Sequence, residues 1–189
     1  MNMVRTTLYK MQINLQEYPF YKAPYAITVC RIEPENNVHL ILEAFARQRK
    51  LPLVIVGNWK QNGYGFKLFK KYSACPHIHL FDPIYESEKI NFLRSRASLY
   101  VHGHQAGGTN PSLVEAMFLA LPILAFDCVY NRYTTENSCI YWANGDELFR
   151  YIAPLDTEKL AALRTIMKTI AGKRYRWRTI TQKYEALYT

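Results

Sequence analysis

Residues 98–117 read SLYVHGHQAGGTNPSLVEAM, and this stretch decides the fold. Its beginning predicts a buried strand, its middle is a glycine loop, and its end predicts a helix. A helix that begins directly after such a loop has unpaired backbone N–H groups in its first turn, and these favour a phosphate or another anion. We interpret the rest of the chain as scaffold for that anion site.

Strands and helices alternate on both sides of this stretch. Apolar runs predict strands at 26–30, 53–56, 77–81, 99–101 and 122–126, and a short sixth strand at 139–141. Helical patterns occur at 38–49, 67–72, 87–96, 112–120, 146–152, 157–170 and 175–188. This order predicts an α/β fold: an open, mainly parallel sheet with helices on both faces, followed by C-terminal helices. We expect residues 25–189 to form the domain and residues 1–24 to be a tail or the remnant of a connection.

Length and composition set further bounds. A chain of 189 residues that is 49% apolar can bury one sizeable core. The sequence has no apolar run long enough to span a bilayer, and its N-terminus lacks the pattern of a secretory signal. The four cysteines show no C-x-x-C spacing, and most of them lie in apolar runs, as reduced thiols in a protein core do. We therefore expect a cytoplasmic protein without disulfides.

The net charge of +9 favours anionic partners. Basic residues cluster only at 67–71 and 173–178, and solvated helix faces are the favoured interpretation of both clusters. At 173–178 the alternative is peripheral contact with the inner face of the membrane, because Tyr175 and Trp177 alternate with the charges. The basic residues form no stripe with a known motif, so we expect no nucleic-acid partner.

Ligands of open α/β sheets bind at the carboxyl ends of the strands. This rule selects the loops at 31–37, 57–65, 82–85, 103–112 and 127–136, which we expect to share one crevice.

The glycine loop and the helix after it contain the first candidate residues. Gly107 and Gly108 allow the backbone to approach a ligand closely, and Asn110 followed by Pro111 suits the start of a helix. Glu115, one turn into the helix, is able to accept two hydrogen bonds from a vicinal diol such as a ribose. A second interpretation stays open, because Ser112-x-x-Glu115 also has the spacing of a capping box.

Arg31 and the histidines are the remaining candidates. Arg31 follows the first strand directly and is placed to bind a diphosphate bidentately, although an ion pair with Glu33 or Glu35 is equally open. His77-x-His79 and His102-x-His104 have ligand spacing, but neither pair has a third ligand nearby in sequence, so we expect no metal. The sequence contains no P-loop, G-x-G-x-x-G or G-x-S-x-G motif.

Several ordered motifs together resemble one family. They are RIEPENN at 31–37, VIVG at 54–57, and GGTNPSLVEAM at 107–117 followed by LPI at 121–123. Residues 18–189 resemble the C-terminal, Rossmann-like half of a GT-B glycosyltransferase of retaining family 4. Within it, CRIEPENN and HGH…GGTNPS are similar to a bacterial surface-polysaccharide subgroup that includes rhamnosyltransferases.

The resemblance implies a role for each candidate residue. Glu115 would hold the ribose hydroxyls and Arg31 the diphosphate, with Arg31 also the catalytic residue and no metal or other cofactor required. The remaining residues implied to bind the nucleotide sugar are Gly107, Gly108, Thr109, Asn110, Ser112, Asp82 and Ile84, the last two bordering the base. The sequence departs from the family at two positions, with Gly107 in place of the usual Glu and Asn36 in place of the usual Lys.

The implied function is the donor-binding half of a glycosyltransferase. It would move a sugar from a dTDP- or UDP-linked donor, with rhamnose suggested by the subgroup, to a polysaccharide or lipid-linked saccharide with retention. In this family the acceptor site belongs to an N-terminal Rossmann-like domain that this chain lacks, so we expect the chain alone to bind nucleotide weakly and not to turn over. The alternatives are a non-catalytic subunit completed by a separate chain and, more distantly, a basic nucleic-acid-binding module.

Overall fold

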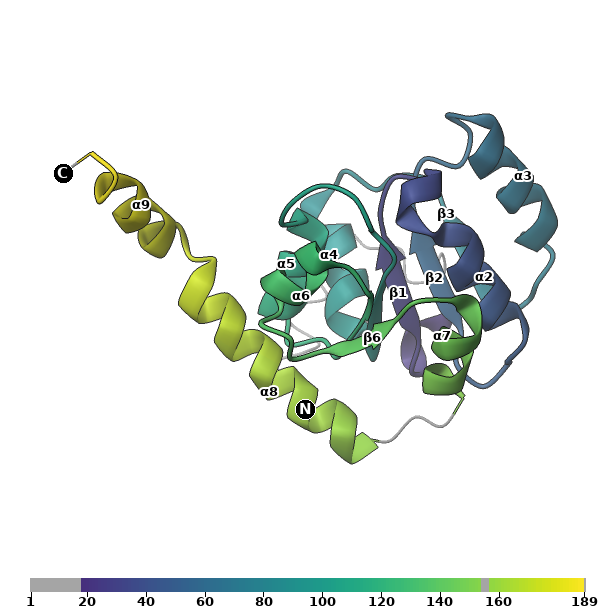
Figure 1. The fold of residues 1–189 in the computed structure, drawn as a ribbon. Helices are drawn as coiled ribbons and strands as arrows, with labels where there is room; N and C mark the ends of the chain where they lie inside the picture. Colours follow the sequence, from purple (N-terminus) through teal and green to yellow (C-terminus); the bar gives the residue numbers. More distant parts are fainter. Residues whose placement is uncertain (1–17, 154–156, 189) are drawn as a thin grey trace.

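The core of the protein is a six-stranded parallel sheet. We describe residues 18–153 and 157–188 of a computed structural model. The strands have the order β3-β2-β1-β4-β5-β6, and all pairs are parallel. Figure 1 labels β1, β2, β3 and β6 of this sheet. Their bounds are Ala26–Val29 (β1), Leu53–Val56 (β2), Ile78–Phe81 (β3), Leu99–His102 (β4), Ile123–Phe126 (β5) and Ile140–Trp142 (β6). The predicted α/β class, the parallel sheet and all six strands are confirmed.

Helices connect the strands. They are α2 (Val38–Ala46), α3 (Gly63–Tyr72), α4 (Ser87–Arg96), α5 (Pro111–Phe118), α6 (Val129–Thr134), α7 (Gly145–Ile152), α8 (Thr157–Arg174) and α9 (Trp177–Glu185), with short 3-10 helices η2 (Pro19–Lys22) and η3 (Pro34–Asn36). The expected bounds of α4 are confirmed. α3 begins four residues earlier than predicted, because the Asn62 side chain caps it by accepting a hydrogen bond from the Gly65 N–H.

The prediction of a loop at 127–136 was wrong, because this segment contains α6. Its cap residue, Cys128, makes no side-chain capping hydrogen bond, so the sequence has no capping signal there. The helix is held instead by Asn131 and Thr134, which are both almost completely buried.

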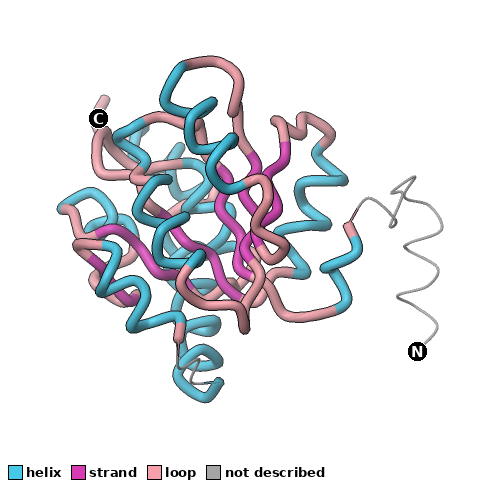
Figure 2. Tube along the Cα trace, turned by 90° about the vertical axis from the view of Figure 1, so that its right-hand side faces the viewer, coloured by secondary structure: helices cyan, strands magenta, loops and turns pink. Residues whose placement is uncertain are grey.

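Each face of the sheet has its own hydrophobic core. On one face, residues of α4, α5 and α8 pack on the sheet, and on the other face residues of α2, α3 and α7 do so. Figure 2 shows the strands enclosed by helices in this way. Because both faces are covered, the strands are almost wholly apolar, as parallel sheets require.

The two ends of the described chain differ in their packing. Tyr18 and Phe20, within the segment expected to be a tail or connection, are buried in the core on the α4 side, whereas residues 1–17 lie outside the described residues. At the other end α9 has no buried residue and projects from the body beyond α8 (Figure 1). Trp177 and Tyr188 are 82% and 89% exposed.

The order of the strands reverses between β1 and β4, which is the switch point where open α/β sheets bind their ligands. Backbone pairing between these strands covers only Ala26 with Leu99 and Ile27 with Tyr100. Beyond that point the Thr28 hydroxyl donates to the Val101 carbonyl at 2.8 Å. Arg31 and the glycine loop follow these two strands and are therefore neighbours.

A close backbone contact fixes the two switch-point loops against each other. A Cβ atom on Gly103, directly after β4, would overlap the backbone carbonyl oxygen of Asn36. Only glycine allows this approach without a shift of the loop after β1.

We predict that Gly103→Ala destabilises the protein by about 1–3 kcal/mol, because the new methyl group must displace backbone. Urea denaturation measures the change. Gly108→Ala is the matched control, because a Cβ atom there meets nothing within 4 Å, and its stability should stay close to that of the unmodified chain. Equal stability of the two variants would contradict the close contact.

Candidate functional site

The loops after β1 and β4 are joined by several hydrogen bonds. The Asn37 side chain donates from Nδ2 to the Gly103 carbonyl at 2.9 Å and to Gln105 Oε1 at 3.1 Å. The Gln105 N–H donates in turn to the Glu35 carbonyl at 3.0 Å. The beginning of the glycine loop is thereby fixed on the loop that carries Arg31.

The loops of the outer strands contact this pair. The Ile32 N–H donates to Asn58 Oδ1 at 2.6 Å, and Lys60 forms an ion pair with Asp82 at 3.0 Å. On the other side, Asn131 of α6 donates to the His104 carbonyl at 2.8 Å. Each of the five predicted loops thus contacts a neighbouring one at the carboxyl ends of the strands.

The start of α5 has the predicted cap and proline, but the prediction of unpaired donors in its first turn was wrong, because the N–H groups of Ser112, Leu113 and Val114 all donate to Asn110. Asn110 is the N-cap, and its side chain accepts a hydrogen bond from the Ser112 N–H at 2.9 Å, with Pro111 in the first helical position. Ser112 is therefore not the cap, and the capping-box interpretation of Glu115 was wrong.

Glu115 instead forms an ion pair that the sequence analysis missed. Its Oε2 lies 2.7 Å from Nη2 of Arg94, and the Arg94 side chain is only 6% exposed whereas that of Glu115 is 53% exposed. The same Nη2 lies 3.5 Å from the Ser112 hydroxyl. The buried Arg94 guanidinium thus binds one carboxylate oxygen of Glu115. The other oxygen of this half-exposed carboxylate is able to accept further hydrogen bonds. Arg94 lies one helical turn after the buried Ile90 on α4, and an arginine on the buried face of a helix was the one local signal for such a partner.

Arg31 is exposed at the switch point. Its side chain is 71% exposed, and Nη1 lies 3.5 Å from Glu33 Oε1, so the alternative ion pair is present. An exposed pair at this distance contributes little, and an anion of higher charge would compete with Glu33 for the guanidinium. Among the residues described here, no ion pair links Arg31 to Glu115, and their joint action on one ligand stays a prediction.

The two positions that depart from the family lie together around His104. Asn36 is buried and donates from Nδ2 to the Arg31 carbonyl at 2.7 Å, while its Oδ1 lies 2.5 Å from His104 Nδ1. A Cβ atom on Gly107 would lie 3.5 Å from His104 Nε2. Gly107 has a φ of +89°, a conformation that other residues rarely adopt.

The other predicted residues occupy the surroundings of this site. Asp82 is exposed beside Lys60, and Ile84 packs partly buried against the core on the α4 side. Thr109 is exposed, and its side chain lies near Tyr175, which is between α8 and α9 and donates from its hydroxyl to the Thr134 carbonyl at 3.0 Å. Gly108 is exposed.

The two histidine pairs lie in different surroundings. Burial lowers the pKa of His102 to about 3, so this ring is neutral at physiological pH. His77 Nε2 lies 3.0 Å from the Phe45 carbonyl. Within residues 18–153 and 157–188 there is no cluster of three or more His, Cys, Asp or Glu side chains with metal-binding geometry.

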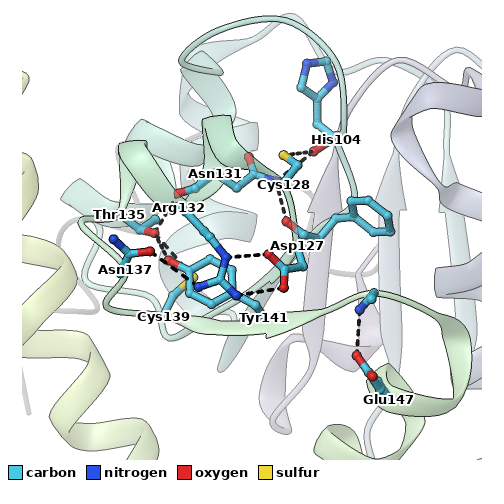
Figure 3. Close-up of polar contacts among 12 residues, drawn as sticks. His104, Asp127, Cys128, Asn131, Arg132, Thr135, Asn137, Cys139, Tyr141 and Glu147 are labelled. Atoms are coloured by element: carbon cyan, nitrogen blue, oxygen red, sulfur yellow. Dashed lines mark hydrogen bonds and ion pairs between the residues drawn. The ribbon is translucent and has the colours of Figure 1, made fainter.

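A cavity of about 820 Å³ lies beside β6, and none of the predicted site residues lines it. Arg132 borders it, donating bidentately to Asp127 at 2.5 and 2.7 Å and lying over the Tyr141 ring (Figure 3). This pairing also holds the pKa of Asp127 below its usual value.

None of the helices described here is long and apolar enough to cross a bilayer.

Residues 12–138 match the family described as "Glycosyl transferases group 1". No curated protein matches the sequence significantly.

Three solved structures illustrate the likeness of the fold. A glycosyltransferase from Rickettsia africae has a TM-score of 0.80 at 13% identity, covering 99% of this chain and 52% of that one. HepE from Anabaena, solved with UDP and glucose, has a TM-score of 0.77 at 17% identity, covering 92% and 50%. Sucrose-phosphate synthase from Thermosynechococcus elongatus has a TM-score of 0.76 at 17% identity, covering 89% and 45%. The chain thus spans about half the length of these proteins.

We predict that Glu115→Gln lowers the free energy of unfolding by about 1–3 kcal/mol, because it leaves the buried Arg94 guanidinium without its anion. The double variant Arg94→Met/Glu115→Gln should recover part of this loss, because both charges are then absent. Glu86→Gln, which removes a solvent-exposed ion pair with Lys89, is the matched control and should have little effect. Arg94→Met is measured as well. If the double variant loses as much stability as Arg94→Met and Glu115→Gln lose together, the two side chains are not coupled.

Proposed function

Since the chain belongs to the group 1 glycosyltransferase family, we propose that it is the donor-binding half of an enzyme that transfers a sugar from a nucleoside diphosphate sugar. The observation that carries this proposal is the position of Arg31 and the capped start of α5, which follow adjacent strands at the switch point of the sheet. Since the first N–H groups of α5 already donate to Asn110, the donors proposed for the diphosphate are the exposed Arg31 guanidinium and the backbone of the glycine loop at the positive end of the helix.

We propose the following arrangement of the donor. Arg31 and the backbone around residues 107–112 bind the diphosphate, and Glu115 accepts hydrogen bonds from the ribose hydroxyls while Arg94 holds its other oxygen. Asp82 and Ile84 border the base. Glycosyl transfer develops negative charge on the departing diphosphate, so fixed donors at this place stabilise the transition state without a metal.

The finer points of the proposal come from the family resemblance. They are transfer with retention, as in family 4, a dTDP- or UDP-linked donor, and rhamnose as the sugar. HepE was solved with UDP and glucose, which supports a uridine nucleotide as the first ligand to test. The proposed acceptor is a polysaccharide or lipid-linked saccharide on the cytoplasmic side of the membrane.

The acceptor site would lie on an N-terminal Rossmann-like domain. α9 has no buried residue, and Trp177 and Tyr184 on it are 82% and 62% exposed. We propose that this helix packs on that domain, since large exposed aromatic side chains are typical of contact surfaces. Contact of the basic residues at 173–178 with a membrane is the alternative for the same segment.

The proposed function predicts nucleotide binding. A nucleoside diphosphate at about one hundred times its Kd should raise the Tm of the chain by roughly 5–10 °C, because it binds only the folded state. UDP, dTDP, GDP and ADP are compared by thermal shift. Arg31→Ala and Glu115→Ala should each lose most of the shift.

The matched control is Arg47→Ala, which removes an arginine at the opposite end of α2, where it pairs with Asp146. It should keep the full ligand-induced shift. If all four nucleotides leave the Tm unchanged, the proposed function is wrong; if Arg31→Ala keeps the shift, the diphosphate is bound elsewhere.

The proposed function also predicts that the chain alone is inactive. The chain by itself should bind nucleotide but show no sugar transfer, because half of the proposed active site lies on the other domain. Release of free nucleoside diphosphate from UDP- and dTDP-sugars, with and without a separately produced N-terminal domain, measures this. Appreciable transfer by the chain alone would refute the proposed division of the site.

A further inference from the structure

His104 is held at its backbone, while its ring points into the glycine loop. Its carbonyl accepts hydrogen bonds from Asn131 Nδ2 at 2.8 Å and from the Cys128 thiol at 3.7 Å. Figure 3 shows the ring pointing away from these two residues. The end of β5 and α6 therefore fix the main chain of His104 and leave the imidazole available on the other side.

One ring nitrogen is already committed. Nδ1 lies 2.5 Å from Oδ1 of Asn36, and the orientation of this amide is set by its Nδ2, which donates to the Arg31 carbonyl at 2.7 Å. Because Oδ1 is only an acceptor, Nδ1 of His104 must carry a hydrogen. Asn36 is 4% exposed and His104 is half-buried, so this contact is partly buried, and it orients the ring.

The second ring nitrogen faces the glycine loop. A Cβ atom on Gly107 would lie 3.5 Å from Nε2, so the bare glycine leaves this nitrogen beside exposed backbone rather than beside a side chain. In the neutral ring Nε2 is an acceptor, and in the protonated ring it is a donor that points into the loop.

Charged and titratable groups surround the ring. Partial burial, the largest effect, lowers the pKa of His104, as does the Arg31 guanidinium. The Glu35 carboxylate and the backbone of Ala106 raise it, and the net shift is below the ordinary value. His102 of β4, with its ring centroid 6.0 Å away, is buried and neutral, and Cys128 precedes α6. A phosphate beside Nε2 would add negative charge and raise this pKa, so an anion that binds here favours the protonated ring.

We propose that His104 is a direct ligand of the donor diphosphate, donating from Nε2 to a phosphate oxygen beside Arg31 and taking up a proton as the anion binds. This inference rests on the proposed function, since it adds a ligand to that site. The sign of the pH dependence follows. Affinity is highest where the ring is protonated in the free chain and falls as the pH rises toward the pKa of the ring in the complex.

Isothermal titration calorimetry tests the proposal with whichever of UDP, dTDP, GDP and ADP gives the largest thermal shift. Titrations in buffers of different ionisation enthalpy count the protons taken up on binding. Between about pH 6.5 and pH 8 the affinity of the unmodified chain should fall about tenfold more than that of His104→Gln, with net proton uptake in the unmodified chain alone. The ionisation of the ligand itself cancels in this comparison.

Two further variants sharpen the result. His104→Lys supplies a permanent cation and should retain binding at both pH values without proton uptake, whereas loss of fold would abolish binding altogether. His77→Gln, at the opposite end of the sheet, is the matched control and should behave like the unmodified chain.

Two results would overturn the proposal, and they are distinguishable. If His104→Gln binds the nucleotide with the same proton uptake and pH dependence as the unmodified chain, His104 is not a ligand, and the proposed function stands. If the unmodified chain binds none of the four nucleotides, the site itself is absent and both proposals are wrong.

Discussion

The hydrogen bonds between the loop after β1 and the loop after β4 are the constraint on which the site depends. Asn37 donates to the Gly103 carbonyl, and the Gln105 N–H donates to the Glu35 carbonyl. The ladder between these strands ends after Ile27, so the loops rather than the strands set the distance between the residues that follow. The close contact between the two loops requires glycine at residue 103, since any Cβ atom there would overlap the Asn36 carbonyl oxygen.

A buried polar network supports the start of α5 from beneath. Arg94 pairs with Glu115 and approaches the Ser112 hydroxyl, which lies near Tyr100. The Tyr100 hydroxyl lies 3.3 Å from the Val29 carbonyl, two residues before Arg31. The network thus connects α4, α5 and the end of β1, and buried polar groups that are paired in this way favour one arrangement over its competitors.

Local signals predicted most of the fold and part of the site. The apolar runs gave all six strands, the bounds of α4 were correct, and the Asn110–Pro111 start of α5 followed from capping preferences. The Arg94–Glu115 pair was missed because no local rule joins residues on two different helices. α6 was missed because it is short and has no polar cap. The orientation of the His104 ring depends on Asn36, which is 68 residues away in the sequence.

The tethering of His104 and Gln105 has a kinetic consequence. Their main chain is already bonded to Asn131 and to the Glu35 carbonyl before any ligand arrives. The conformational entropy of this segment is therefore lost during folding rather than at encounter. Association at this part of the glycine loop needs no slow rearrangement of the backbone, so differences in affinity among related anions should reside in their dissociation rates.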